Sequence, residues 1–337
     1  MKAIGYQQAL PITHADSLRD IEIDAPVASG RDLLVEVAAI AVNPVDTKIR
    51  ANVAPPAGET KVIGWDAVGI VRAVGADVSL FKPGDRVWYA GSLTRPGANA
   101  ELHLVDERIA GHAPSTLADA QAAALPLTTL TAWELLFDRL EVAPGKQQGD
   151  AILIVGAAGG VGSILTQLAR RLTGLTVIGS ASRAETEAWV RGLGAHHVID
   201  HSKPLSQELA RIGVPQVRYV AGLTQTDRHF EEIVASLAPQ GRLALIDDPA
   251  ALDVTKLKRK SVSLHWEFMY TRSMFETPDM VAQHRILEEV AALVDAGLIR
   301  TTLGEHFGTI NATNLKRAHA LIESGKARGK IVLEGWN

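Results

Sequence analysis

A glycine-rich turn between an apolar segment and an amphipathic segment most constrains how this chain folds. Residues 152–155 (Ile-Leu-Ile-Val) form an uninterrupted apolar run, which is typical of a strand buried on both faces of a parallel sheet. A turn rich in glycine occupies 156–162, and apolar residues then recur at helical spacing from Ile164 to Leu172. This order of strand, turn and helix predicts a βαβ unit, the context in which such a turn binds a dinucleotide.

The glycines of this turn suit a pyrophosphate. Gly159 allows a close approach of the backbone, and Gly162 allows the following helix to pack on the strand. The helix expected from about Val161 offers unsatisfied N–H groups. In a strict Gly-x-Gly-x-x-Gly pattern the first position is Ala157, which fits if its φ is negative. A glycine turn in another kind of α/β protein is the alternative, and the flanking strand and helix favour the nucleotide site. The predicted cofactor contacts here are Gly156, Ala158, Gly159, Gly160, Val161 and Gly162.

Length and composition narrow the class of protein. A chain of 337 residues predicts about two domains. It contains no cysteine, which excludes disulfides, thiolate nucleophiles and cysteine-based metal sites. The net charge of −4 and the apolar runs, all shorter than a membrane span, favour neither nucleic acid nor a membrane as a partner. We expect a cytoplasmic protein, since the N-terminus shows no signal-peptide pattern.

Strand and helix patterns divide the chain into two kinds of region. Short strand patterns separated by Gly- and Pro-rich turns fill the first 110 residues and predict an all-β or partly open barrel unit. A helix is expected over 129–140, continuing after Pro126. Strands then alternate with helices, which predicts a doubly wound parallel sheet. The strands expected after the glycine turn are 176–179, 197–199, 218–220, 242–246 and 261–265, and a last strand is expected at 330–333.

Four motifs carry a resemblance to a known family over the whole chain. They are Asn43-Pro44-Val45-Asp46, the run 64–71 (Gly-Trp-Asp-Ala-Val-Gly-Ile-Val), the run 82–87 (Lys-Pro-Gly-Asp-Arg-Val) and the glycine turn. The chain resembles the medium-chain dehydrogenase/reductase superfamily, most of all its zinc-free quinone oxidoreductase branch, with the zinc-type alcohol dehydrogenase-like proteins among its relatives. The resemblance implies a GroES-like β-barrel-type catalytic domain formed by 1–127 and 269–337, with a Rossmann NADP-binding domain, 128–268, inserted between them.

Departures from the zinc enzymes of that superfamily bear on the chemistry. Those enzymes have a cysteine ligand where this chain has Asn43, and a His-Glu pair where it has Trp65 and Asp66. Catalytic zinc takes about three thiolate, imidazole or carboxylate ligands, which these positions do not supply. The four-cysteine lobe for structural zinc is missing too. We therefore expect no metal, and Trp65 is expected to fill the space left by zinc.

The end of the second strand of the α/β region indicates the cofactor. NAD-specific sites place an acidic residue there for the ribose 2′-hydroxyl, but 176–184 contains none. Ser180, Ser182 and Arg183 stand there instead, and hydroxyls with a guanidinium suit a 2′-phosphate. The sequence therefore predicts NADP (NADPH). For Arg183, an ordinary surface position at the start of a helix is the alternative.

The resemblance implies further site residues. Asn43 and Asp46 flank the vacated metal position, and Thr131 lies beside the nicotinamide in related enzymes. The structural alternative for Asn43 is a turn residue before Pro44. For Thr131 it is a helix cap, or a threonine that hydrogen-bonds back to its own helix. Tyr89 is expected either to line the cleft or to belong to the barrel core. Further predicted cofactor contacts are Leu223, Thr224, Leu245, Ile246 and Lys330.

These residues predict an NADPH-dependent oxidoreductase that transfers hydride to an electrophilic carbonyl substrate, with quinones the leading class, without catalytic zinc. Such a substrate is already electron-poor and needs no metal to polarise it. Alternatives are an enone or enoyl-thioester reductase on the same fold, a zinc-dependent alcohol dehydrogenase, and a non-catalytic NADPH-binding protein. No residue stands out as a general acid, so protonation from solvent is expected. A homodimer is expected, with contacts at 261–266.

Overall fold

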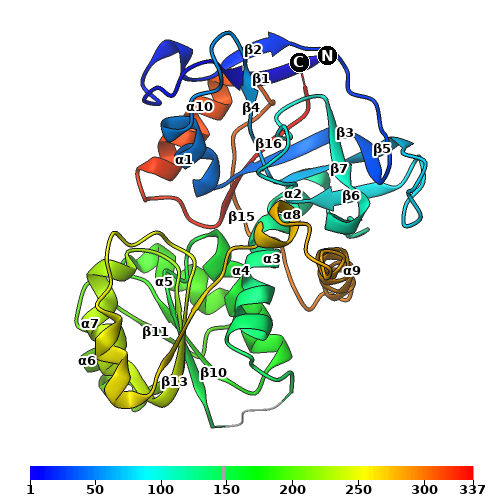
Figure 1. The fold of residues 1–337 in the computed structure, drawn as a ribbon. Coiled ribbons are helices and arrows are strands. Elements are labelled where there is room, and N and C mark those ends of the chain that lie inside the picture. The colour runs from blue at the N-terminus through cyan, green and yellow to red at the C-terminus, as the bar shows by residue number, and fades with distance from the viewer. Residues whose placement is uncertain (146–148, 337) are drawn as a thin grey trace. The chain divides into compact units, whose positions relative to one another are not determined.

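The protein forms two compact units, seen in a computed structural model that describes residues 1–145 and 149–336. The terminal unit comprises Met1–Leu130 and Tyr270–Asn337, and the central unit comprises Thr131–Met269. The boundaries expected from the sequence lie at 127/128 and 268/269. Both chain ends belong to the terminal unit (Figure 1).

The terminal unit is built on a seven-stranded sheet in the order β15-β16-β3-β5-β6-β8, with β7 also paired to β3. A second sheet of three strands has the order β2-β1-β4. The strands of the larger sheet are β3 (Asp32–Val42), β5 (Ala67–Val74), β6 (Arg86–Tyr89), β7 (Leu102–Asp106), β8 (Ala110–His112), β15 (Leu303–His306) and β16 (Lys330–Glu334). Those of the smaller sheet are β1 (Lys2–Tyr6), β2 (Arg19–Glu22) and β4 (Lys61–Val62).

Strand β3 is the centre of the larger sheet, because β16 and β5 pair with its two edges. Both neighbours are antiparallel to it, with Ile331 opposite Val42 and Ala67 opposite Ile40. Alternate residues such as Val35 and Val37 are buried, as expected for a strand with one face on the core. This register brings the start of β16 and the start of β5 to the same end of β3.

The helices of the terminal unit include two that begin with proline, Pro44 and Pro126. Proline suits the first helical position, where its missing N–H is not needed. The sequence placed the second of these helices after Pro126, whereas it begins at that residue and changes to a π-helical segment at Glu134. The helices are α1 (Pro44–Asn52), α2 (Asp119–Ala123), α3 (Pro126–Trp133, which crosses into the central unit), α8 (Thr271–Met274), α9 (Ala282–Asp295) and α10 (Ala312–Glu323).

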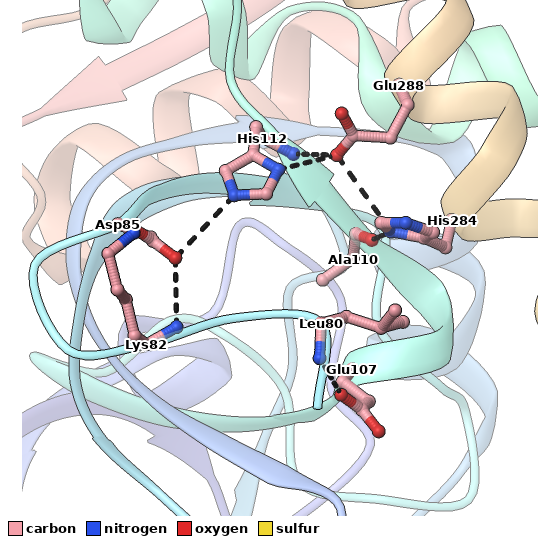
Figure 2. A network of polar contacts seen from close by, with 8 residues as sticks. All are labelled: Leu80, Lys82, Asp85, Glu107, Ala110, His112, His284 and Glu288. Atoms are coloured by element: carbon pink, nitrogen blue, oxygen red, sulfur yellow. Dashed lines mark hydrogen bonds and ion pairs between the residues drawn. The ribbon is translucent and has the colours of Figure 1, made fainter. Parts of the chain in front are cut away.

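A polar network fastens helix α9 to strand β8. Glu288 Oε1 accepts hydrogen bonds from the backbone N–H of His112 at 2.7 Å and from its Nδ1 at 2.8 Å. His284 Nδ1 donates to Ala110 O at 2.8 Å, and the opposite nitrogen of His112 lies 3.6 Å from Asp85 (Figure 2). These contacts join the C-terminal stretch of the chain to the N-terminal barrel, so both stretches form one unit.

The central unit is a six-stranded, all-parallel sheet in the order β11-β10-β9-β12-β13-β14. The order reverses between β9 and β12, which is the doubly wound arrangement. The predicted fold class is therefore confirmed for this unit. The strands are β9 (Ala151–Val155), β10 (Thr176–Ser180), β11 (His197–Ile199), β12 (Val217–Gly222), β13 (Leu237–Leu245) and β14 (Ser263–Trp266).

Four α-helices connect these strands, and α6 and α7 pack side by side (Figure 1). They are α4 (Gly160–Leu172), α5 (Ala184–Gly192), α6 (Leu205–Arg211) and α7 (Thr226–Ser236). A π-helical segment (Glu134–Arg139) precedes the sheet, and a 3₁₀ segment (Val254–Lys260) precedes β14. No helix within the described ranges has an apolar stretch long enough to span a membrane. Strand β14 is an edge strand on which Trp266 is exposed, and the homodimer contact predicted there stays a prediction.

Candidate active site

Three adjacent strands of the terminal unit bring Asn43, Asp66 and Lys330 together. Asn43 directly follows β3, Asp66 directly precedes β5, and Lys330 begins β16. Because Ile331 pairs with Val42 and strands β16 and β3 are antiparallel, Lys330 comes beside Asn43. Asp66 reaches the same end from the other edge, where its carbonyl accepts the Ala41 N–H at 3.1 Å. Residues far apart in the sequence thus form one buried cluster.

The Lys330 ammonium is the centre of this cluster. Its Nζ donates to Asp66 Oδ2 at 2.8 Å, to Val42 O at 3.1 Å and to Asn43 Oδ1. Asn43 Nδ2 in turn donates to Asp66 Oδ2 at 2.8 Å, and the Leu127 N–H donates to Asp66 Oδ1 at 2.7 Å. The three N–H bonds of the ammonium therefore all have acceptors. The predicted contact of Lys330 with a cofactor phosphate stays a prediction, and the structure places this side chain inside the terminal unit.

Burial and hydrogen bonding act in opposite directions on Asp66. Its side chain is completely buried, which raises its pKa above the ordinary value, and Lys330, Asn43 and the Leu127 N–H favour the carboxylate and offset part of this effect. Removing one partner of such a buried pair leaves an uncompensated charge, which typically costs about 3–5 kcal/mol. The cluster is therefore a single electrostatic unit in which each member depends on the others.

Asp46 stands beside the cluster with a different environment. It occupies the first turn of α1, where its Oδ2 accepts the Asn43 N–H at 2.6 Å. No side-chain cation among the described residues contacts it directly, and burial raises its pKa to about 7 against the weaker opposing effects of Asn43 and Lys330. Asp46 thus positions Asn43, and its predicted catalytic role stays a prediction.

Aromatic side chains fill the space around the cluster. Trp65 is buried, its indole N–H donates to Ser92 O at 3.1 Å, and its ring meets that of Tyr270 edge-on at 6.5 Å. Tyr89 is also buried and stacks on His103, with its hydroxyl 3.1 Å from His103 Nδ1. Of the two expectations for Tyr89, its full burial favours the barrel core.

The chemistry of these donors does not fit catalytic zinc. Asn43 offers an amide, the indole N–H of Trp65 has no lone pair to give, and Asp66 is already bonded to an ammonium and a backbone N–H. An ammonium 2.8 Å from the one carboxylate would repel a divalent cation. The residues of this cluster therefore do not supply the ligand set of a catalytic zinc ion.

The glycine turn of the central unit has the geometry of a phosphate cradle. Gly156 has φ +87°, a conformation that favours glycine, and a Cβ on Gly162 would lie 2.5 Å from Ala157 Cα. A Cβ on Gly159 would meet only Gly156 O at 3.6 Å, so the space beside it is open. The first intrahelical bond of α4 runs from Ser163 N to Gly159 O at 2.9 Å, and the N–H groups before it have no intrahelical acceptor. Ala157 is not among the residues of positive φ, as its place in the pattern requires.

Ser180, Ser182 and Arg183, which the sequence predicts to contact the ribose 2′-phosphate of NADP, differ in their exposure to solvent. Ser182 is exposed and the Arg183 side chain is 43 % exposed at the start of α5. Ser180 is buried, where its Oγ accepts the Gly156 N–H at 3.0 Å and lies 3.1 Å from His201 Nδ1. Ser180 therefore supports the turn directly, and Arg183 and Ser182 remain accessible to a phosphate.

The remaining predicted contacts lie at the carboxyl ends of the central strands. Leu223 and Thr224 follow β12, and Leu245 ends β13 with Ile246 after it. Thr131 is buried in α3. In a doubly wound sheet this edge, at the point where the strand order reverses, is where a dinucleotide binds.

Sequence reasoning missed two groups. His201 follows β11 and contacts Ser180, and its place after a predicted strand could have indicated it. The second group is the pair of buried carboxyls Glu134 and Glu267, which belong to separate segments of the central unit. No local pattern marks that pair, because their contact arises only when the π-helical segment packs beside the end of β14.

The buried carboxyl of Asp46 predicts a pH dependence of stability. Its pKa of about 7 in the folded state exceeds the ordinary value of 3.8, so folding binds a proton that the unfolded chain releases. The contribution of Asp46 to the free energy of unfolding is therefore largest below about pH 4. It decreases by on the order of 4 kcal/mol as pH rises to about 7. Asp46→Asn, which cannot ionise, should become more stable than the wild type as pH rises from about 5 to 8.

Thermal unfolding of both proteins across this pH range measures the effect. Asp24→Asn, at an exposed position, is the matched control and should follow the wild type. Parallel curves for Asp46→Asn and the wild type would contradict the assigned burial of a protonated carboxyl.

Comparison with known proteins places this geometry in a family. Residues 29–118 match the model of the alcohol dehydrogenase GroES-like domain, and residues 193–333 match that of the zinc-binding dehydrogenases. A zinc-type alcohol dehydrogenase-like protein of Staphylococcus aureus is 38 % identical over 99 % of both chains.

Two solved structures extend the comparison. A protein of Rhizobium etli, named as a candidate zinc-dependent alcohol dehydrogenase, is 59 % identical, with a TM-score of 0.97 over 100 % of this chain and 98 % of that one. The quinone oxidoreductase of Escherichia coli, solved with NADPH, is 26 % identical, with a TM-score of 0.83 over 99 % of this chain and 100 % of its own. The chain therefore belongs to the medium-chain dehydrogenase/reductase superfamily of oxidoreductases, among its zinc-type alcohol dehydrogenase-like proteins.

Proposed function

We propose that this protein is an NADPH-dependent reductase of electrophilic carbonyl compounds, with quinones as the leading substrate class. The observation that carries the proposal is the buried cluster of Lys330, Asp66 and Asn43. By the family resemblance, Asn43 and the adjacent Trp65 stand at the positions of metal ligands in the zinc enzymes. Here an ammonium fixed by three acceptors supplies the positive charge.

This cluster limits the substrates that the protein can reduce. A metal ion accepts electron density from a substrate oxygen, whereas an ammonium already bonded to Val42 O, Asn43 Oδ1 and Asp66 Oδ2 offers only its field. A simple ketone would stay poorly activated. A quinone is electron-poor from the outset and accepts hydride without a Lewis acid, while the cofactor carries the reducing equivalents.

The proposed cofactor rests on the residues that follow β10. The 176–184 stretch contains no acid, and the Arg183 side chain is 43 % exposed, with its guanidinium 3.5 Å from Glu185 Oε1. His201 Nδ1 lies 3.1 Å from Ser180 Oγ at the same edge, and burial together with the nearby charge of Arg228 lowers the pKa of His201. The quinone oxidoreductase of E. coli, which shares the fold, was solved with NADPH.

A panel of acceptors tests the proposed function. We expect the purified protein to oxidise NADPH with quinones, as measured by the loss of NADPH absorbance, and to keep this activity after exhaustive chelation. Simple alcohols with NADP should give no turnover. Chelator-sensitive alcohol oxidation would contradict the proposal, turnover of enones alone would indicate an enone reductase, and cofactor binding without turnover would indicate a non-catalytic role.

The variant Asn43→Ala ties this activity to the cluster. The substitution removes both amide contacts, one to Lys330 and one to Asp66, so we expect turnover to fall about tenfold or more. The dissociation constant of NADPH should not change. A loss of NADPH binding in proportion to the loss of turnover would count against this role of Asn43.

The position of Arg183 predicts a preference for NADPH over NADH. Arg183→Ala removes a charge-assisted contact with the 2′-phosphate, so kcat/KM for NADPH should fall by about 10- to 100-fold while that for NADH stays unchanged. Arg191→Ala, on the same helix and paired with Glu187, is the matched control. A wild-type preference for NADH, or an equal loss with both cofactors, would contradict the assignment.

The glycine turn offers a test with two neighbouring substitutions. Gly159→Ala places a methyl group in open space, so it should leave the melting temperature unchanged but weaken NADPH binding at least tenfold. Gly162→Ala forces a methyl against Ala157 Cα at 2.5 Å and should destabilise the central unit. Unchanged NADPH affinity in Gly159→Ala, measured by fluorescence titration, would exclude this turn as the pyrophosphate site.

A further inference from the structure

Two buried carboxyl groups, Glu134 and Glu267, meet in the interior of the central unit. Glu134 begins the π-helical segment Glu134–Arg139, and Glu267 directly follows β14. Both residues are at most 3 % exposed. Arg139 Nε donates to Glu267 Oε2 at 2.9 Å, and no N–H or hydroxyl of the described residues reaches Oε1 of the same carboxyl. The Glu134 carboxyl lies close enough to share a hydrogen bond with Glu267.

The π-helical geometry explains how both Glu134 and Arg139 reach Glu267. Residues five apart stand about 140° apart around an α-helix and would face different neighbours. A π-helix closes its bonds between residues five apart, as in the contact from Leu140 N to Leu135 O at 2.9 Å, and so brings such residues to similar sides. A carboxyl and a guanidinium of one segment therefore both face Glu267.

The charges around Glu267 leave a proton on this pair. Burial and the neighbouring Glu134 raise the pKa of Glu267 to about 9, and Arg139 offsets only part of this effect. Two adjacent carboxyls with one guanidinium are close to neutral when they share one proton. The nearby His265 on β14 responds to other charges, because Arg242, Glu141 and Arg139 influence its pKa and Glu267 does not.

Two links of the backbone connect the pair to the predicted nicotinamide end of the site. The Glu267 N–H donates to the carbonyl of Leu245 at 2.8 Å, and Leu245 is a predicted cofactor contact at the end of β13. Glu134 follows Thr131, the residue expected beside the nicotinamide, by three positions in a continuous helical segment. Glu267 thus lies at the carboxyl edge of the sheet, with Glu134 beside it, and in doubly wound sheets a dinucleotide binds along that edge.

Lys330 is less suited to supply a proton. Its three N–H bonds are all made, and the Asp66 carboxylate stabilises the charged form. Loss of a proton from Lys330 would leave Asp66 buried and uncompensated. The carboxyl pair of the central unit has no such constraint, because Arg139 would compensate part of the charge that appears when the pair ionises.

We propose that Glu134 and Glu267 form the proton source of the reduction, a role that rests on the proposed function. When bound, the reduced nicotinamide would supply the hydride for the new C–H bond, and the carbonyl π electrons would move to the substrate oxygen. That oxygen takes the proton of the pair, directly or through a bridging water, as the O–H bond of the Glu267 carboxyl breaks. The pair is left as two carboxylates beside Arg139, and a proton from solvent restores it from the side of Arg139, whose side chain is 32 % exposed.

Glu267→Gln tests the proposal, because an amide fills the same volume and cannot release a proton. In the wild type, infrared spectra should show the carbonyl stretch of a protonated carboxyl at neutral pH and its loss as pH rises through about 9. The variant should lack this band. With a quinone as acceptor its kcat should fall about a hundredfold and lose the alkaline limb of the wild-type pH profile, while the NADPH dissociation constant stays unchanged.

Glu134→Gln should change the same two measurements in a different way, because it keeps the carboxyl of Glu267. It removes the carboxyl that raises the pKa of Glu267, so the infrared transition and the alkaline limb should both move to lower pH. Glu187→Gln, on the surface of α5, is the matched control and should leave both unchanged. The pair of variants keeps the test decisive if one of them folds poorly.

The outcomes separate this inference from the proposed function. A wild type that oxidises NADPH with none of the acceptors would overturn the proposed function. An active wild type whose turnover and pH profile persist in Glu267→Gln would overturn only the role of the pair. The absence of a protonated carboxyl band at neutral pH would also overturn it, whatever the activity.

Discussion

The ion pair between Lys330 and Asp66 is the interaction on which the terminal unit depends most. Both side chains are almost completely buried, and neither could be tolerated there alone. Each also binds a third group: Lys330 contacts the end of β3 through Val42 and Asn43, and Asp66 accepts the N–H of Leu127 near the start of α3. The pair therefore holds together stretches from the beginning and the end of the chain.

The topology of the sheet makes this pair possible. Strand β16 and strand β5 pair with opposite edges of β3, so the first residue of β16 and the residue before β5 come to the same end of that strand. The chain must return after the central unit to supply β16. The cluster thus joins stretches of chain that lie on either side of the central unit in the sequence, since Lys330 and Asp66 are separated by 264 residues.

Three buried carboxyls in this protein show how partners decide the state of an acid. Asp66 has an ammonium, an amide and a backbone N–H, all of which favour the carboxylate. Asp46 has a backbone N–H and a more distant cation, and burial raises its pKa to about 7. Glu267 faces a second carboxyl, and its pKa rises to about 9 although a guanidinium contacts it. Burial raises the pKa of all three carboxyls, and the partners of each one decide how much of this effect is offset.

Much of the fold could be predicted from local patterns. Strand β9 is buried on both faces, so it appears as a continuous apolar run, and Gly156 and Gly162 mark a turn that side chains would obstruct. The change from α- to π-helix at Glu134 could not be predicted in this way, because both helices have similar local preferences and packing selects between them. The resemblance in the four motifs named the family, which the comparisons confirmed.

The sequence alone determined the order of elements, the glycine turn between β9 and α4, and the absence of cysteine from the chain. Only the tertiary structure decided which charges are withdrawn from water and which groups neutralise them. Lys330 came to Asp66, Ser180 came to the glycine turn, and Glu134 came to Glu267 through contacts between segments distant in the chain. The physical reason is that secondary structure follows from short-range periodicity, whereas the protonation and charge of a side chain depend on desolvation and on partners that folding alone brings near.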